Sequence, residues 1–191
     1  MSIRKILTEP NKILRKKSLR VENVHKDIQQ LMDDMLETLY AAPGIGLAAI
    51  QVGVAKKVIV MDISRSRNDI GRDKNDINKN EDKESKKPMY FVNPEIIWKS
   101  EDKFTYEEGC LSLPNQFAEI DRPKQCHVKY LDYNGHSQEL RADGLLATCI
   151  QHEIDHLEGI LFIDYLSKLK KEMIIKKLSK QTKDNIERIV V

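Results

Sequence analysis

Residues 151–159, with the sequence QHEIDHLEG, constrain the fold of this chain more than any other segment. His152 and His156 are four positions apart, and side chains at that spacing share a face in an α-helix. Their two imidazoles can therefore turn toward one metal ion, with Glu153 beside that face. In zinc peptidases built on the HExxH pattern, this glutamate is the general base for water. Such a site also needs a third protein ligand and one open position.

The residues around this motif predict a helix over 143–159, with the sequence DGLLATCIQHEIDHLEG. Asp143 is a suitable N-cap, and Gly159 is a suitable stop at the C-terminal end. The alternative interpretation is that both histidines lie on the solvent side of an amphipathic helix and bind nothing. The placement of the pair on a predicted helix favours the metal site.

The position of a third ligand also distinguishes the known classes of metallohydrolase. The segment HEIDHLEGILF begins like the metzincin pattern HExxHxxGxxH, but the third ligand position is Phe162, which cannot bind a metal. A thermolysin-like site needs a downstream glutamate, and the candidates are Glu172 and Glu187. Both lie in a lysine-rich segment, where we expect a solvated role.

Cys110 is the best candidate for the third ligand. It follows a strand-like pattern in YEEGCLSLP, and a thiolate with two imidazoles leaves a fourth metal position open. The odd number of cysteines, 3 in all, argues for free thiols rather than a disulfide framework. We expect Cys126 and Cys149 to act as small buried hydrophobes.

Periodicity predicts the remaining elements. Apolar residues recur every three or four positions from Ile28 to Leu39, which is typical of an amphipathic helix, and APG then ends it. A last helix begins near Ser167, with apolar residues on one side and lysines on the other. Alternating or β-branched runs predict five strands, at 56–64, 89–98, 103–108, 126–133 and 137–142, with YNGH as a hairpin turn.

The length of 191 residues fits one catalytic domain, 1–191. Within it, residues 64–87 are rich in Asn, Asp, Lys and Ser, so they cannot bury enough apolar surface to offset the entropy of ordering. We expect them to form a mobile surface loop inserted in a β-hairpin. The N-terminal segment is basic, but it contains Pro10 and alternates in polarity, so we interpret it as part of the domain rather than a transit peptide.

The charge balance disfavours binding that is driven by charge alone. The chain has 32 Lys and Arg against 30 Asp and Glu, a formal net charge of +2. We therefore expect no direct nucleic-acid specificity and no attraction to an acidic membrane. No apolar run approaches the roughly 18 to 20 residues of a membrane span.

Three motifs in order and spacing resemble those of the peptide deformylase family: GIGLAAIQVG at 44–53, EEGCLSLP at 107–114 and QHEIDHLEG at 151–159. Most of the chain outside the insertion is similar as well, including the opening segment LTEPNKILRKKSLRV. The resemblance implies an α+β fold in which mixed or antiparallel sheets pack around a central HExxH helix. An amphipathic N-terminal helix and a C-terminal helix complete that fold.

The resemblance also implies an activity: removal of the formyl group from the N-terminal formyl-methionine of nascent polypeptides, with release of formate. It implies that Cys110, His152 and His156 hold one divalent ion, often Fe²⁺ and replaceable by Zn²⁺, Ni²⁺ or Co²⁺. Glu153 is then the acid and base. The side chain of Gln51 and the backbone N–H of Leu111 are implied to stabilise the oxyanion.

Substrate contacts are carried over in the same way. The resemblance assigns backbone binding to Gly46 and places four more residues around the substrate: Ile45, Gly109, Thr148 and Cys149. It further suggests an ion pair between Glu108 and Arg122, which would fix the strand that presents Cys110.

Two departures from the family pattern leave alternatives open. Phe117 stands where many bacterial members have arginine, which removes a cationic contact, and the 64–87 insertion is unusually long. A low-activity deformylase-like metallohydrolase is therefore one alternative. A nascent-chain-binding module, with transient ribosome contact through its basic last helix, is another. The composition fits a bacterial cytoplasmic enzyme or an organellar enzyme, of a plastid or mitochondrion, whose leader has been removed.

Overall fold

The structure, a computed structural model, describes residues 2–64 and 86–189, with the backbone alone for 181–189. The helical segments are η1 (Lys12–Arg15), α1 (Lys26–Ala41), η2 (Ala49–Val52), α3 (Gly144–Leu157), η3 (Phe162–Tyr165) and α4 (Lys168–Ile189). The strands are β1 (Gly46–Ala48), β2 (Val58–Met61), β3 (Met89–Lys99), β4 (Lys103–Cys110), β5 (Leu113–Pro123), β6 (Gln125–Leu131) and β7 (Ser137–Asp143). The predicted α+β class is confirmed.

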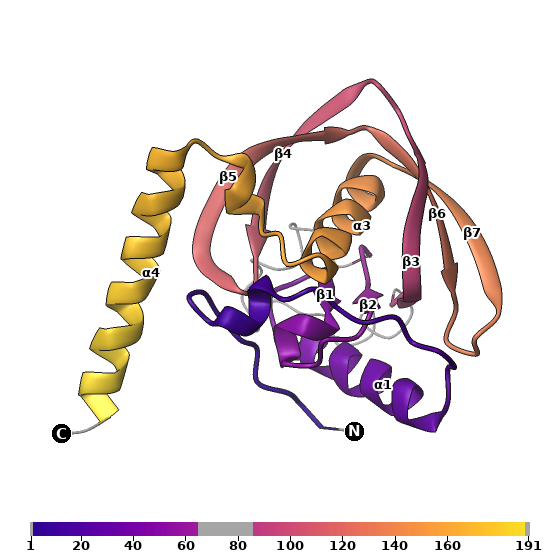
Figure 1. Ribbon diagram of the computed structural model, residues 1–191, viewed down its shortest axis with the longest axis horizontal. Helices are drawn as coiled ribbons and strands as arrows, with labels where there is room; N and C mark the ends of the chain where they lie inside the picture. The colour runs from indigo at the N-terminus through magenta and orange to yellow at the C-terminus, as the bar shows by residue number, and fades with distance from the viewer. Residues whose placement is uncertain (1, 65–85, 190–191) are drawn as a thin grey trace, which may run out of the picture.

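Two antiparallel sheets surround α3 (Figure 1). The larger has the strand order β1-β2-β3-β6-β7, and the smaller is the β4–β5 hairpin. In the figure, α3 lies in the middle of the molecule with strands on both sides, and α4 lies at the left edge. The buried Leu178 of α4 packs in one cluster with Leu113 and Ile120 of β5. A helix placed in this way can be reached by side chains from either sheet.

The larger sheet is covered by a helix on each face at its β1–β2 end. Ile59 and Met61 belong to a core cluster with Cys149 and Ile150 of α3. The alternate residues of β2, Val58 and Val60, pack in a second cluster with the apolar face of α1. All four residues of β2 are therefore buried, which explains its uninterrupted apolar sequence.

Most predicted elements are confirmed, and two strands were missed. The helix from Ile28, the five predicted strands and the YNGH turn correspond to α1, to β2, β3, β4, β6 and β7, and to the β6–β7 connection. β1 is only three residues long, and β5 contains Pro114, so neither has a clear strand pattern. Asp143 occupies the N-cap of α3, as predicted, although its side chain makes no capping hydrogen bond.

The connection between β2 and β3 is held together at its base. Val58–Met61 pairs antiparallel with Met89–Val92, so the insertion does lie within a β-hairpin. The buried Asp62 carboxylate accepts hydrogen bonds from Tyr40 Oη at 2.8 Å and from the backbone N–H groups of Ser64 and Lys87, each at 3.1 Å. The prediction that the insertion is a mobile surface loop concerns mainly residues 65–85, which lie outside the described residues.

No helix in the part of the chain that the structure describes is both long enough and apolar enough to span a membrane.

The C-terminal end of α3 depends on Gly159. Its N–H donates to His156 O at 3.1 Å, and the next N–H, of Ile160, donates to Asp155 O at 2.9 Å, which is the Schellman arrangement. Gly159 has φ +76°, and a Cβ at this position would lie 2.5 Å from Arg15 O. The predicted stop at Gly159 is therefore confirmed, and the backbone packing leaves no room for a side chain.

We expect Gly159→Ala to lower the free energy of unfolding by about 3 kcal/mol, the sum of a left-handed backbone penalty and a backbone clash. Gly53→Ala is the matched control, because Gly53 has φ +83° but a Cβ there would lie 3.7 Å from its nearest neighbour, Leu7 Cδ1. That variant should lose only about 1 kcal/mol. Urea denaturation measures both, and equal losses would show that the chain near Arg15 moves aside at no cost.

Candidate metal centre and catalytic cavity

Three potential metal ligands converge from two elements. Cys110 is the last residue of β4, and His152 and His156 lie one turn apart on α3. One ligand atom from each lies within 4.8 Å of the other two, and Cys110 Sγ is 3.2 Å from His156 Nε2. The β4–β5 register shifts between Gly109 and Cys110, and such a shift re-aims the following side chain. The distances fit three groups around one small ion.

His152 is oriented by a carboxylate behind it. Its Nδ1 lies 2.7 Å from Glu108 Oε2, so the Nδ1 proton points to Glu108 and Nε2 is left for a metal. Glu108 also pairs with Arg122, whose Nη2 donates to Oε2 at 3.1 Å, so the predicted ion pair is confirmed. Burial alone would raise the pKa of Glu108, but the hydrogen bonds with His152 and Arg122 outweigh burial and lower this pKa. This carboxylate therefore remains charged.

The donor set suits a soft or borderline divalent ion. A thiolate with two imidazoles is typical of zinc and also binds ferrous iron. Burial lowers the pKa of His156 well below its usual range, which favours the neutral imidazole that binds metals. The residues present therefore fit one divalent ion with an open position.

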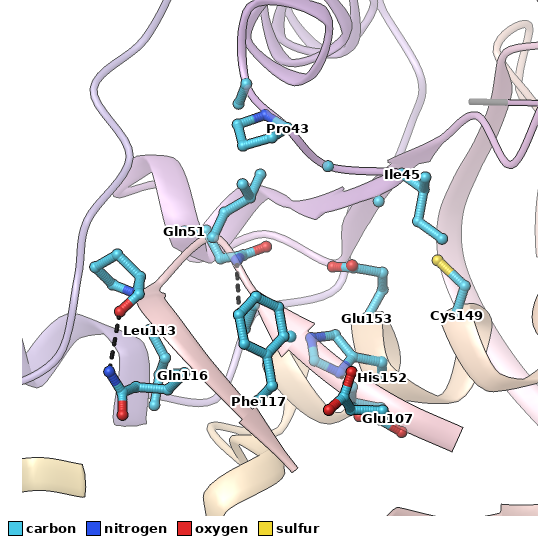
Figure 2. Close-up of a pocket in the computed structure, with 18 of the residues that line it drawn as sticks. Pro43, Ile45, Gln51, Glu107, Leu113, Gln116, Phe117, Cys149, His152 and Glu153 are labelled. Carbon is cyan, nitrogen blue, oxygen red and sulfur yellow. Dashed lines mark hydrogen bonds and ion pairs between the residues drawn. The ribbon is translucent and has the colours of Figure 1, made fainter. Parts of the chain in front are cut away.

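Glu153 lies beside this group with one carboxylate oxygen unpaired. The side chain is buried, and its Oε2 has no hydrogen-bond partner among the described residues. Burial raises the pKa of Glu153 to about 7. Figure 2 shows its carboxylate directed away from His152 and toward the side of the cavity where Gln51 lies. A group of this kind can take up and release a proton near neutral pH.

Gln51 is held with its amide nitrogen toward the thiol. Its Oε1 accepts a hydrogen bond from Ala48 N at 2.8 Å, so the NH₂ end must point the other way. Nε2 lies 3.1 Å from Ser112 Oγ and 3.5 Å from Cys110 Sγ. The side chain is almost fully buried, and its donor is fixed before any substrate arrives.

A cavity of about 660 Å³ opens in front of these groups. Gly46 lies close to its floor, because a Cβ there would be 2.5 Å from Glu153 Oε1 and 2.9 Å from Cys149 Sγ. The cavity is lined by ten of the eleven residues that the sequence assigned to the site: Ile45, Gly46, Gln51, Gly109, Cys110, Leu111, Thr148, Cys149, His152 and Glu153. The eleventh, His156, lies behind them in the metal-ligand group.

Phe117 lies at the rim of the cavity. The Phe117 ring packs over Gly109, where a Cβ would be 2.6 Å from it, yet 59% of the Phe117 residue is exposed.

Two residues near the centre of the site were not predicted from the sequence. They are Ser112, which contacts Gln51, and Asp155, which contacts Arg122. Their only sequence signal is proximity to the motifs, and hydrogen bonding in the folded chain is needed to identify them.

Comparison with known proteins gives consistent matches over nearly the whole chain. A family model described as polypeptide deformylase matches residues 3–172. A peptide deformylase of Pelagibacter ubique is 64% identical over 180 residues, which are 94% of this chain and 95% of that protein.

Solved structures agree with these sequence matches. A peptide deformylase from Ehrlichia chaffeensis has a TM-score of 0.83 and 40% identity, covering 97% of this chain and 99% of that chain. A structure of the Ehrlichia chaffeensis protein in complex with actinonin has a TM-score of 0.82 and 43% identity, over 95% of this chain and 98% of that chain.

We expect Cys110→Ala and His156→Ala each to lose stoichiometric metal, because two ligands rarely hold an ion in an open site. Elemental analysis of the purified variants gives the metal content per chain. Cys126→Ala is the control, since Cys126 is buried in the larger sheet and belongs to the core cluster. Full metal content in Cys110→Ala or His156→Ala would contradict the ligand assignment.

Proposed function

This chain belongs to the peptide deformylase family, and from that premise we propose how its own residues remove the formyl group from an N-terminal formyl-methionine. It is a metal-dependent hydrolase of that family. The observation that carries the residue assignment is the convergence of one thiol, two imidazoles and an unpaired buried carboxylate at one end of an apolar cavity. Release of formate from a formyl-methionyl peptide, measured against the unformylated peptide, is the direct assay.

The proposed metal ligands are Cys110, His152 and His156. A divalent ion bound by them supplies a Lewis acid, which makes water acidic enough to ionise near neutral pH. The chain contributes the geometry, because Glu108 fixes the His152 ring and the end of β4 presents the Cys110 thiol to the two imidazoles of α3.

The proposed acid and base is Glu153. It accepts a proton as water adds to the formyl carbon, and it delivers a proton to the nitrogen as the C–N bond breaks. Formate and a peptide with a free N-terminal amine are the products. A pKa of about 7 suits both transfers, and the unpaired Oε2 is available for the proton.

Two donors are proposed to stabilise the negative charge that develops on the formyl oxygen. One is Gln51 Nε2, whose direction is fixed by the Ala48 N–H on the other end of the amide. The other is the backbone N–H of Leu111, which follows the thiol directly in the chain. Donors fixed in advance need not reorganise during the reaction.

The methionine side chain is proposed to enter the apolar part of the cavity. Ile45, Thr148 and Cys149 line it there, while the backbone at Gly46 and Gly109 contacts the peptide. Gly46 is suited to this role because nothing projects from its Cα between the substrate and Glu153. Phe117, at the rim, replaces the cationic contact of other members with an apolar one, which would alter the preference for the residues after methionine.

The compartment and a ribosome contact are also proposals. The relatives matched at 64%, 53% and 47% identity are bacterial peptide deformylases, which supports action on nascent chains in a bacterial cytoplasm. Exposed lysines on α4 support a transient contact with the ribosome: Lys168, Lys170, Lys176, Lys177 and Lys180. Co-sedimentation with ribosomes that weakens as salt rises would support this contact.

We propose Fe²⁺ as the native ion. Protein purified without oxygen should contain iron, and its activity should decay in air because a thiolate beside ferrous iron is readily oxidised. Zn²⁺- or Ni²⁺-substituted protein should survive the same exposure. Elemental analysis and formate release over time measure both effects, and an air-stable iron form would count against the proposal.

We expect Glu153→Gln to keep its metal and its melting temperature but to lose turnover by roughly a hundredfold or more. Glutamine has nearly the same shape, yet it cannot accept the proton from water or deliver one to nitrogen. The loss should appear in kcat rather than in KM.

Glu158→Gln is the control for that substitution, because Glu158 lies two residues after His156 and pairs with Lys57 and Lys17 at the surface. It should retain normal formate release. Near-normal release by a metal-loaded Glu153→Gln variant would show that another group moves the proton.

A further inference from the structure

A closed ring of polar contacts ties α3 to β4 and β5 behind the metal ligands. We propose that Asp155 and Tyr165 are positioning residues that keep this ring closed and so set how tightly the metal is retained. The inference rests on the proposed metal ligands and adds two residues that do not touch metal or substrate.

The ring can be followed from atom to atom. His152 Nδ1 lies 2.7 Å from Glu108 Oε2, and Arg122 Nη2 donates to the same oxygen at 3.1 Å. Arg122 Nη1 then donates to Asp155 Oδ2 at 2.7 Å. Asp155 lies three residues after His152 on α3, so the backbone of that helix closes the ring. Glu108 is on β4 and Arg122 is on β5, so three elements are joined.

Tyr165 supports the ring from outside. Its hydroxyl donates to the same Asp155 Oδ2 at 2.8 Å, and the centroid of its ring is 4.9 Å from the Arg122 guanidinium carbon. Burial, together with the charge of Asp155, raises the pKa of Tyr165, so the hydroxyl remains a donor at neutral pH. η3 thus contributes a second contact to Asp155 and a cation–π contact to Arg122.

The guanidinium is the rigid member of this ring. Arg122 is only 3% exposed and presents a planar fork of donors, of which Nε and Nη2 face Glu108 and Nη1 faces Asp155. Although burial opposes the charge, the hydrogen bonds and charges of Glu108 and Asp155 raise the pKa of Arg122. A permanent cation between two carboxylates therefore joins the strand that carries Cys110 to the helix that carries both histidines.

This arrangement predicts which property depends on the ring. Without Asp155, the Glu108–Arg122 pair and the hydrogen bond from Gln151 to Pro123 of β5 remain, but α3 loses its contact with Arg122 of β5 one residue before His156. The helix can then rotate slightly about its axis, and the two imidazoles lose their alignment with the thiol. Residues behind metal ligands commonly contribute about 10- to 100-fold in metal affinity. The effect should therefore appear in metal retention before it appears in the fold.

The experiment measures the rate at which Zn²⁺-loaded protein loses its metal to an excess of chelator. Asp155→Asn, which removes the charge, should lose Zn²⁺ about tenfold faster than the native chain. Tyr165→Phe keeps the aromatic side chain over Arg122 and removes only the hydroxyl, so it should accelerate the release of Zn²⁺ less than Asp155→Asn does. Tyr130→Phe is the control, because Tyr130 packs on Phe91 in the larger sheet, away from the ring, and it should release Zn²⁺ at the native rate.

Melting temperatures of the metal-free proteins separate positioning from general stability. The proposal expects the metal-free variants to melt close to the native metal-free chain. Native release rates in both Asp155→Asn and Tyr165→Phe would overturn it, and so would faster release that is matched by an equal loss of metal-free stability. If the native chain itself retains no Zn²⁺, the proposed metal site is wrong. If the native chain and both variants retain Zn²⁺ equally well, only the proposal about the ring of polar contacts is wrong.

Discussion

The rest of the structure depends on one constraint: α3 is buried although it carries polar and ionisable side chains. Gln151, His152, Glu153 and His156 are all buried on this helix. A buried polar group without a partner is costly, so the surrounding strands must supply partners. β5 does this for Gln151, whose Nε2 donates to Pro123 O at 2.9 Å, and β4 does it for His152 through Glu108. Glu153 Oε2 has no partner among the described residues, so it is available for proton transfer.

The two sheets have different tasks around this helix. The larger sheet provides apolar packing and, through β1, brings Gly46 against Glu153. The β4–β5 hairpin provides polar groups: the thiol at the end of β4, and the carboxylate and guanidinium that face each other across the two strands. The site thus lies where an apolar layer and a polar hairpin meet on one helix. Such a division lets the helix be both firmly packed and chemically reactive.

Much of this could be predicted from the sequence, and the exceptions share a physical cause. The spacing of His152 and His156 indicated the helix and two candidate metal ligands, and the motif around Cys110 indicated a candidate third. β1 and β5 were missed because pairing with neighbouring strands, rather than their own sequence pattern, makes them strands. β1 is only Gly46–Ala48, and β5 is polar with a proline near its start. Asp155 could not be assigned because its role depends on Arg122, which is distant in sequence and close only in the folded chain.

The hydrogen bonds around Asp62 have a consequence for engineering. Because Ser64 and Lys87 are both fixed to this buried carboxylate, the protein sets the distance between the two ends of whatever chain joins them. The entropy of closing a flexible connection grows only with the logarithm of its length. The β2–β3 connection is therefore a natural position to graft a reporter peptide or an affinity handle, or to shorten the chain, with α3 left as it is.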